Sequence, residues 1–219
     1  MKSLIIIPAR KGSKRIKNKN LIKVLNKPLI LFTINYAKQL SKNKFDIIVT
    51  TNCKKIKKIC SDEKISYLDR PKNISGDYST MDEVIFHAFN KINKEYKYII
   101  LLQPTSPLRK RGLIHKALKI LENKKQFDSL IHLANDLSFT GKIIDNQWIP
   151  SYNAGIRSQD IKKKFVSTGN LFIYRSHLYK ERLTLPRKTY GLVSNNQKWL
   201  DIDNKEDLIL LKYFLKNTK

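Results

Sequence analysis

The chain has 219 residues, 41% of them hydrophobic, which suffices for one domain with a real core and is too many for a disordered chain. No apolar run approaches the roughly 20 residues that a membrane span needs, and the first one is too short for a signal peptide, so we expect a cytoplasmic protein. Lys and Arg (44) outnumber Asp and Glu (18), which suggests a polyanionic partner such as nucleic acid. The sequence has no RNP-like, zinc-finger or basic-zipper motif, so we predict no specific nucleic-acid binding.

Strands and helices are predicted to alternate along most of the chain. Leu4–Ile7 is a continuous apolar run ended by Pro8, which is typical of a buried parallel strand. Later strands are predicted at 45–50, 65–68, 98–102, 127–133 and 169–174, with an edge piece at 192–193. Helices are predicted at 28–40, 54–64, about 81–92 and 112–123, and after Asn204. This order indicates an α/β fold with a mainly parallel sheet covered by helices.

The alternation breaks between residues 134 and 164. Two short strand-like pieces, at 141–145 and 147–150, are joined by a turn at Asp145–Asn146. We interpret the stretch as an insertion, with Trp148, Ile149 and Tyr152 near its tip. Because an apolar patch on such an excursion usually marks an interface, the insertion is expected to contact a partner subunit.

A cationic loop follows the first strand. Gly12 lets the backbone approach a phosphate closely, and Ser13 can donate a hydrogen bond to it. Such a loop at the carboxyl end of a buried strand is where open α/β sheets bind phosphorylated ligands. The alternative is a basic turn that only faces water. The loop's cationic residues are Arg10, Lys11, Lys14, Arg15, Lys17 and Lys19.

Two further stretches carry polar groups at the ends of predicted strands. Gln103–Arg109 has the sequence QPTSPLR, in which two prolines fix a loop with hydroxyls between them; the alternative is a turn with a helix cap. Asp201 and Asp203 lie two residues apart in an extended segment, where both project to one side. A cation between them would relieve their repulsion, although acids at this place can also be helix caps.

Five motifs in order resemble those of the acylneuraminate cytidylyltransferases, which make CMP-activated nonulosonic sugars (sialic, legionaminic and pseudaminic acid) from CTP. They are IIPARKGSKRIKNKN, RP with DYST, QPTSPLR, RSQD with FVSTGNLFI, and DID before the last helix. The resemblance implies a Rossmann-like, GT-A-like nucleotidyltransferase fold with three α/β/α layers in a single domain. It also implies a homodimer in which the insertion at about 134–164 reaches the partner's active site.

The resemblance also assigns roles to residues. It implies a nucleotide site at Arg10, Gly12, Ser13, Lys14, Asn20, Arg70, Ser79 and Thr80. It implies a sugar site at Gln103, Lys142, Arg157, Gln159 and Thr168. Lys19, near the α-phosphate, and Asp203 would be catalytic, and Asp201 with Asp203 would hold Mg2+ or Mn2+. Thr168 and Asn170 depart from the family pattern, which leaves the identity of the sugar open. A Kdo cytidylyltransferase would share the first loop and the acidic site, and a basic nucleic-acid-binding protein is the alternative from another class.

Overall fold

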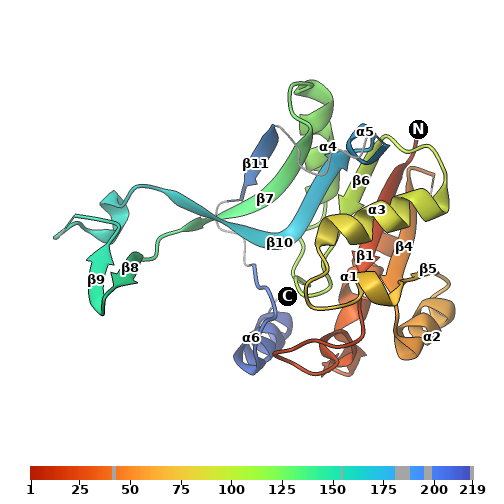
Figure 1. The fold of residues 1–219 in the computed structure, drawn as a ribbon, viewed down its shortest axis with the longest axis horizontal. Coiled ribbons are helices and arrows are strands. Elements are labelled where there is room, and N and C mark those ends of the chain that lie inside the picture. The colour runs from red at the N-terminus through yellow and green to blue at the C-terminus, as the bar shows by residue number, and fades with distance from the viewer. Residues whose placement is uncertain (41–42, 154, 181–187, 195–198, 218–219) are drawn as a thin grey trace.

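The fold is built on one seven-stranded sheet in the order β11-β7-β10-β6-β1-β4-β5 (Figure 1). This computed structural model describes residues 1–40, 43–153, 155–180, 188–194 and 199–217. Every neighbouring pair in the sheet is parallel except the two pairs made by β10, so the predicted mainly parallel mixed sheet is confirmed. The strands are β1 (Ser3–Pro8), β4 (Phe45–Thr51), β5 (Ser66–Asp69), β6 (Tyr98–Leu101), β7 (Ser129–Asp136), β10 (Lys164–Arg175) and β11 (Thr189–Val193).

Helices cover both faces of this sheet, which makes the three predicted layers. Alternate residues of β1 point to opposite faces, so Ile5 and Ile7 join one core cluster while Leu4 and Ile6 join another. The first cluster is closed by α1 (Leu29–Lys38), α2 (Lys54–Asp62) and α4 (Leu113–Asn123), and the second by α3 (Met81–Ile92) and α5 (His177–Lys180). Both faces of β1 are therefore dry, which explains its continuous apolar sequence.

A third, smaller cluster joins the two ends of the chain. Ile16 and Val24 from the cationic loop region pack with Leu200, Ile202 and Leu211. These residues belong to or flank β2 (Lys23–Val24), β3 (Lys27–Pro28) and α6 (Lys205–Lys216). The packing brings the acidic segment at 201–203 beside the basic loop at 10–19. Asn204 caps α6, which begins directly after it as predicted, in a reciprocal capping box with Asp207.

The predicted insertion forms an arm that extends away from the body (Figure 1). Its tip is the hairpin of β8 (Gly141–Ile144) and β9 (Gln147–Pro150), whose residues are mostly exposed. Positive φ angles at Asp145 and Asn146 (48° and 64°) make the predicted turn. The flanking strands are longer than predicted, because β7 and β10 continue pairing as far as Asp136 and Lys164 before the hairpin begins.

Short 3-10 helices complete the described chain at Lys19–Leu21, Lys72–Ile74 and Ser158–Asp160. Among the described residues, no helix combines the length and apolar character needed to cross a bilayer.

Candidate active site

A cleft of about 360 Å³ opens at the carboxyl ends of β1 and β6. Four segments far apart in the sequence line it: the loop after β1, the stretch between β5 and α3, the loop after β6, and the segment before α6. Predicted site residues that line the cleft are Arg10, Ser13, Lys14, Lys19, Asn20, Arg70, Ser79, Gln103 and Asp203. The structure therefore gathers most of the predicted nucleotide-binding residues at one place.

The first ion-pair cluster of the cleft is centred on Asp77. One carboxylate oxygen accepts from the Arg10 guanidinium at 2.8 Å, and the other lies 3.2 Å from Lys14 Nζ. The hydrogen bond from Arg10, with the help of Lys14, holds the pKa of Asp77 below its usual value. Two cations of the loop are thus arranged around a single carboxylate.

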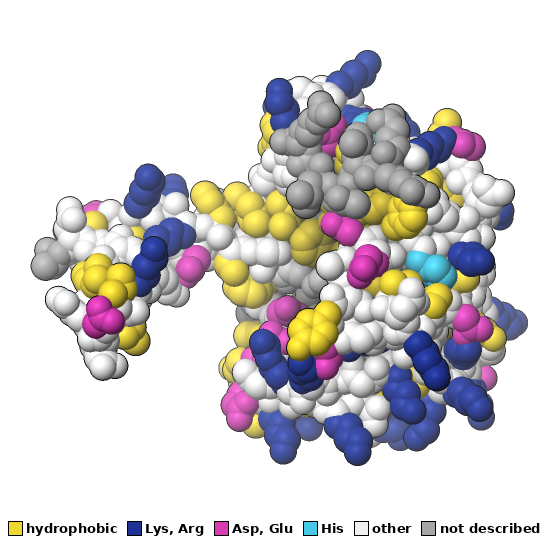
Figure 2. Space-filling model, in the orientation of Figure 1, with side chains coloured by type: hydrophobic (Ala, Val, Ile, Leu, Met, Phe, Trp, Pro, Cys, Tyr) yellow, Lys and Arg dark blue, Asp and Glu magenta, His cyan; other side chains and the backbone are white. Residues whose placement is uncertain are grey.

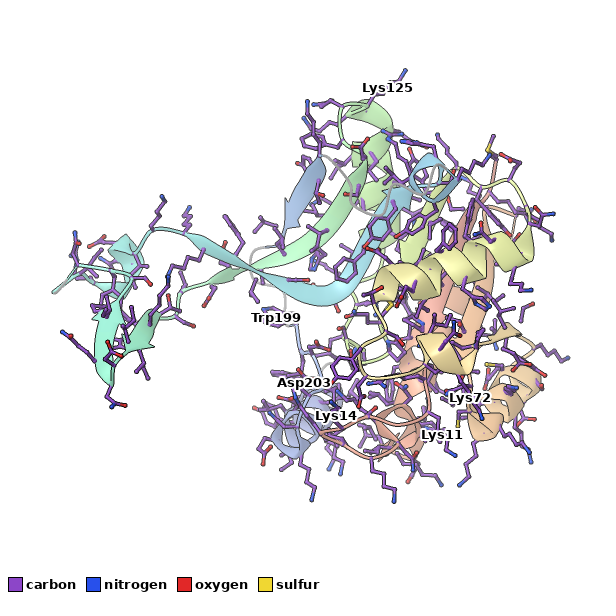
Figure 3. The ribbon with its side chains drawn as sticks, in the orientation of Figure 1. Lys11, Lys14, Lys72, Lys125, Trp199 and Asp203 are labelled. Carbon is purple, nitrogen blue, oxygen red and sulfur yellow. The ribbon has the colours of Figure 1, made fainter. Side chains whose placement is uncertain are left out.

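The second cluster is centred on Asp203, which Figure 3 shows close to the basic loop and Lys14. Lys19 Nζ lies 3.0 Å from one carboxylate oxygen and Arg15 2.7 Å from the other. Lys19 is buried, and its ammonium also donates to the Ile202 carbonyl. Burial would raise the pKa of Asp203, but the hydrogen bond and charge of Lys19, together with Arg15, keep it below its usual value.

Arg70 adds a buried guanidinium to the wall of the cleft. It donates to the Thr50 carbonyl at 2.9 Å, and only 6% of the residue is exposed. Burial and the neighbouring charge of Arg10 lower the pKa of Arg70 to about 10. Two guanidinium groups that repel each other make this side of the cleft a favourable place for an anion.

Four predicted residues of the body, as distinct from the arm, do not line the cleft. Gly12 is exposed at the turn of the loop with φ of 85°, which favours glycine there. Thr80 accepts from the Glu83 amide as the cap of α3. Asp201 accepts from the Ser106 hydroxyl at 3.3 Å, so Asp201 and Asp203 both have partners within the protein. Thr168 is fully buried, with its hydroxyl 2.6 Å from His132 Nδ1.

The burial of Thr168 follows from a bulge in β10. Between the pairs Ser167–Leu133 and Phe172–Ile131, residues 168–171 lie opposite the single residue His132. Gly169 within the bulge has φ of 67°, and a Cβ there would lie 2.3 Å from Ser106 Oγ. The bulge therefore touches the loop after β6 so closely that only glycine fits.

The three arm residues assigned to the sugar do not reach the cleft of their own chain. Lys142 and Gln159 are exposed on the arm, as is Arg157, which pairs with Asp160 at 2.7 Å. None of the three is among the residues that line the cleft. A sugar bound in this cleft would therefore need another source for these groups.

Several residues in or near the cleft were not assigned from the sequence. Arg15 and Asp77 lie in recognised motifs, but no sequence pattern shows that they pair with Asp203 and Arg10 across the cleft. Thr105 lines the cleft while its carbonyl accepts from the Ile202 amide at 2.8 Å. Arg109 was seen only as the end of the QPTSPLR motif, and the structure gives it three hydrogen bonds inside the protein.

The carboxylates at the cleft are few. Among the described residues, no group of three or more His, Cys, Asp and Glu side chains gathers as a metal site. Asp203 presents half-exposed carboxylate oxygens at the cleft, and such oxygens are the ligands that Mg2+ accepts.

Comparison with known proteins was made by sequence and by fold. A sequence model of the cytidylyltransferase family matches residues 4–217. N-acylneuraminate cytidylyltransferase of Streptococcus agalactiae serotype III is 31% identical over 95% of this chain. The chain spans about half of that relative, 52% of its length. Pseudaminic acid cytidylyltransferase of Campylobacter jejuni is 28% identical over 99% of this chain and 97% of its own.

Solved structures share the fold at low sequence identity. A CMP:2-keto-3-deoxy-manno-octonic acid synthetase complexed with CTP has a TM-score of 0.72, with 15% identity over 99% of both chains. The 4-diphosphocytidyl-2C-methyl-D-erythritol synthase of Anaerococcus prevotii has a TM-score of 0.71, with 15% identity over 99% of this chain and 96% of its own. The predicted Rossmann-like nucleotidyltransferase fold is confirmed, and the match over residues 4–217 shows that the chain belongs to the cytidylyltransferase family.

Proposed function

We propose that this protein transfers the cytidylyl group of CTP to the anomeric hydroxyl of a nonulosonic acid, giving a CMP-sugar and pyrophosphate. The observation that carries the proposal is the cleft itself, where cations from the loop after β1 converge with Arg70 and face Asp203. The family match and the names of the relatives support the same reaction and substrate class.

The basic side of the cleft would hold the triphosphate. In the structure Arg10 and Lys14 are paired with Asp77, so a bound triphosphate would take over these cations with more charge than one carboxylate offers. Ser13 and Asn20 line the same wall, and we assign Arg70 and Ser79, which also line the cleft, to the cytosine. Thr80 would act there only by setting the start of α3.

In the reaction, the sugar's anomeric oxygen bonds to the α-phosphorus while the bond to the bridging oxygen of pyrophosphate breaks. Positioning and charge stabilisation supply most of the rate enhancement in such transfers. Lys19 would face the negative charge that develops on the α-phosphate, because its ammonium is already fixed beside Ile202 and Asp203. No histidine among the described residues lines the cleft, so we assign the hydroxyl proton to Asp203.

The residues at the cleft fit a Mg2+ or Mn2+ ion. Mg2+ is usually held by one or two carboxylates together with substrate phosphates. Asp203 would supply the first, and Asp201, now bonded to Ser106, the second. A bound ion would polarise the α-phosphate and acidify the attacking hydroxyl.

The acceptor side is proposed to be completed by a second copy of the chain in a C2 dimer. Large apolar side chains on the arm are unusually exposed, including Ile143 (73%), Trp148 (50%) and Phe165 (50%), and yellow patches mark the arm in Figure 2. Burying them against a partner would bring its Lys142, Arg157 and Gln159 to this chain's cleft, beside Gln103.

A substrate panel tests the reaction directly. We expect pyrophosphate release with CTP and Mg2+ when sialic, legionaminic or pseudaminic acid is the acceptor, and none when UTP or ATP replaces CTP. Kdo is included as an acceptor because a Kdo-activating enzyme shares the fold. Turnover with Kdo alone, or with no acceptor in the panel, would overturn the proposal.

A further inference from the structure

Arg109 is a cationic residue near the cleft that the proposed reaction does not use. Each nitrogen of its guanidinium donates to a different segment: Nε to the Asn170 carbonyl at 2.7 Å, Nη1 to Thr33 Oγ1 at 2.8 Å, and Nη2 to the Gln103 carbonyl. Thr33 and Asn170 are fully buried, so the head of the side chain lies inside the protein.

The three acceptors belong to three segments, of which the loop after β6 lines the cleft. Gln103 begins the loop after β6, Asn170 lies in the bulge of β10, and Thr33 lies in the middle of α1. The loop and the bulge also touch at Gly169, where a Cβ would lie 2.9 Å from Gln103 Oε1. The orientation of the Gln103 side chain therefore depends on how these two segments are held together.

We propose that Arg109 is a positioning residue for the acceptor sugar, holding the β6 loop against the β10 bulge so that Gln103 is presented to the cleft. This inference rests on the proposed function, because it takes Gln103 to contact the sugar. The nucleotide side is held by other contacts, namely those of Asp77 with Arg10 and Lys14 and of Arg70 with Thr50. The effect of Arg109 should therefore fall on the acceptor and not on CTP.

The geometry requires arginine in particular. Three acceptors on three segments are met by the planar fork of one guanidinium, whereas a lysine ammonium is a single point that cannot reach all three. Removing one nitrogen donor of Arg109 leaves the carbonyl oxygen of Gln103 or Asn170 without this hydrogen bond. The β6 loop would then have to move to restore a partner for that oxygen.

The experiment compares Arg109→Lys with Arg111→Lys, a matched change at an exposed arginine two residues away. For each protein the KM for the acceptor, kcat, the Kd for CTP by calorimetry and the melting temperature are measured. For Arg109→Lys we expect the acceptor KM to rise about tenfold or more, with the Kd for CTP within about twofold of wild type. Arg111→Lys should change neither.

If Arg109 had only a structural role, Arg109→Lys would lower the melting temperature and leave the acceptor KM and the Kd for CTP unchanged, and that result would overturn the inference. Equal losses of affinity for CTP and for the acceptor would overturn it as well. If Arg109→Lys does not fold, Thr33→Val takes its place, because Thr33 does not line the cleft and loses only the hydroxyl that Arg109 bonds. Its acceptor KM should rise about two- to fivefold with CTP binding unchanged, and an unchanged acceptor KM would overturn the inference. A wild-type protein without cytidylyltransferase activity would instead refute the proposed function, while its CTP affinity would still be measurable.

Discussion

The cationic loop after β1 and the arm at 134–164 both carry residues assigned to a substrate, but they differ in how those residues are held. In the loop, Arg10 and Lys19 are fixed by carboxylates across the cleft of the same chain. On the arm, Arg157 is exposed and bonds only to its neighbour Asp160 among the contacts described. If the proposed function holds, the nucleotide side is thus prepared within one chain, whereas the acceptor side would be completed only when a second chain covers the arm.

The largest effect is expected from the carboxylate at the centre of the cleft. Asp203→Asn should lower kcat about 100-fold or more, because an oxygen ligand and the proposed base both lose their charge. The fold should persist, since the Asp203 side chain is half exposed. Steady-state kinetics across Mg2+ concentrations, with melting temperatures, measure this; Asp62→Asn, at an exposed residue of α2, is the control.

Asp201→Asn should show a smaller loss, because Asp201 lies behind the lining and is bonded to Ser106. If the Asp203 and Asp201 variants both keep near wild-type activity at every Mg2+ concentration, the acidic pair serves only the start of α6.

The next largest effect on activity is expected from the cations of the loop. Arg10→Ala and Lys19→Ala should each cost about 2–4 kcal/mol of transition-state stabilisation, seen in kcat/KM for CTP, while acceptor affinity changes little. Lys17→Ala is the matched control, because Lys17 is exposed in the same loop and does not line the cleft. Normal CTP kinetics in both cleft variants would contradict the assignment of the loop to the triphosphate.

The sequence predicts some features of the fold and of the cleft and not others, for a physical reason. Buried strands and their breakers, such as Leu4–Ile7 before Pro8, leave a local signal, and so does the cap at Asn204. Which charges pair is a property of three-dimensional packing, so the bonds of Asp203 to Arg15 and Lys19 could not be read from spacing. The same holds for Thr168, whose burial depends on a bulge that the apolar pattern of β10 does not show.

An effect of intermediate size is expected from an experiment on the arm. Mixing Asp203→Asn chains with Arg157→Ala chains should restore activity if Arg157 acts in the partner's cleft, because one site of each mixed dimer then has both residues. With complete exchange, random pairing makes half of the dimers mixed, so about a quarter of wild-type activity should return. Subunit exchange is verified by mass-tagged chains; no recovery after verified exchange would mean that each chain completes its own site.

The smallest effect is expected at Asp77, where the protein's own carboxylate occupies cations that a triphosphate needs. Asp77→Asn should strengthen binding of inorganic tripolyphosphate about two- to fivefold in calorimetry, since exposed ion pairs are weak competitors. Tripolyphosphate is the probe because it carries no base that could contact Asp77. Asp69→Asn, which disrupts an exposed pair with Lys57 away from the cleft, should leave binding unchanged.

The pKa of Asp77 is held below its usual value, so the ion pairs of Asp77 with Arg10 and Lys14 persist as pH falls until that lowered pKa is reached. Asp77 therefore stays ionised at both pH 6 and pH 8, so the variant should bind tripolyphosphate more tightly than wild type at both values, and no gain at either pH would mean that Asp77 does not compete for the cations of the loop.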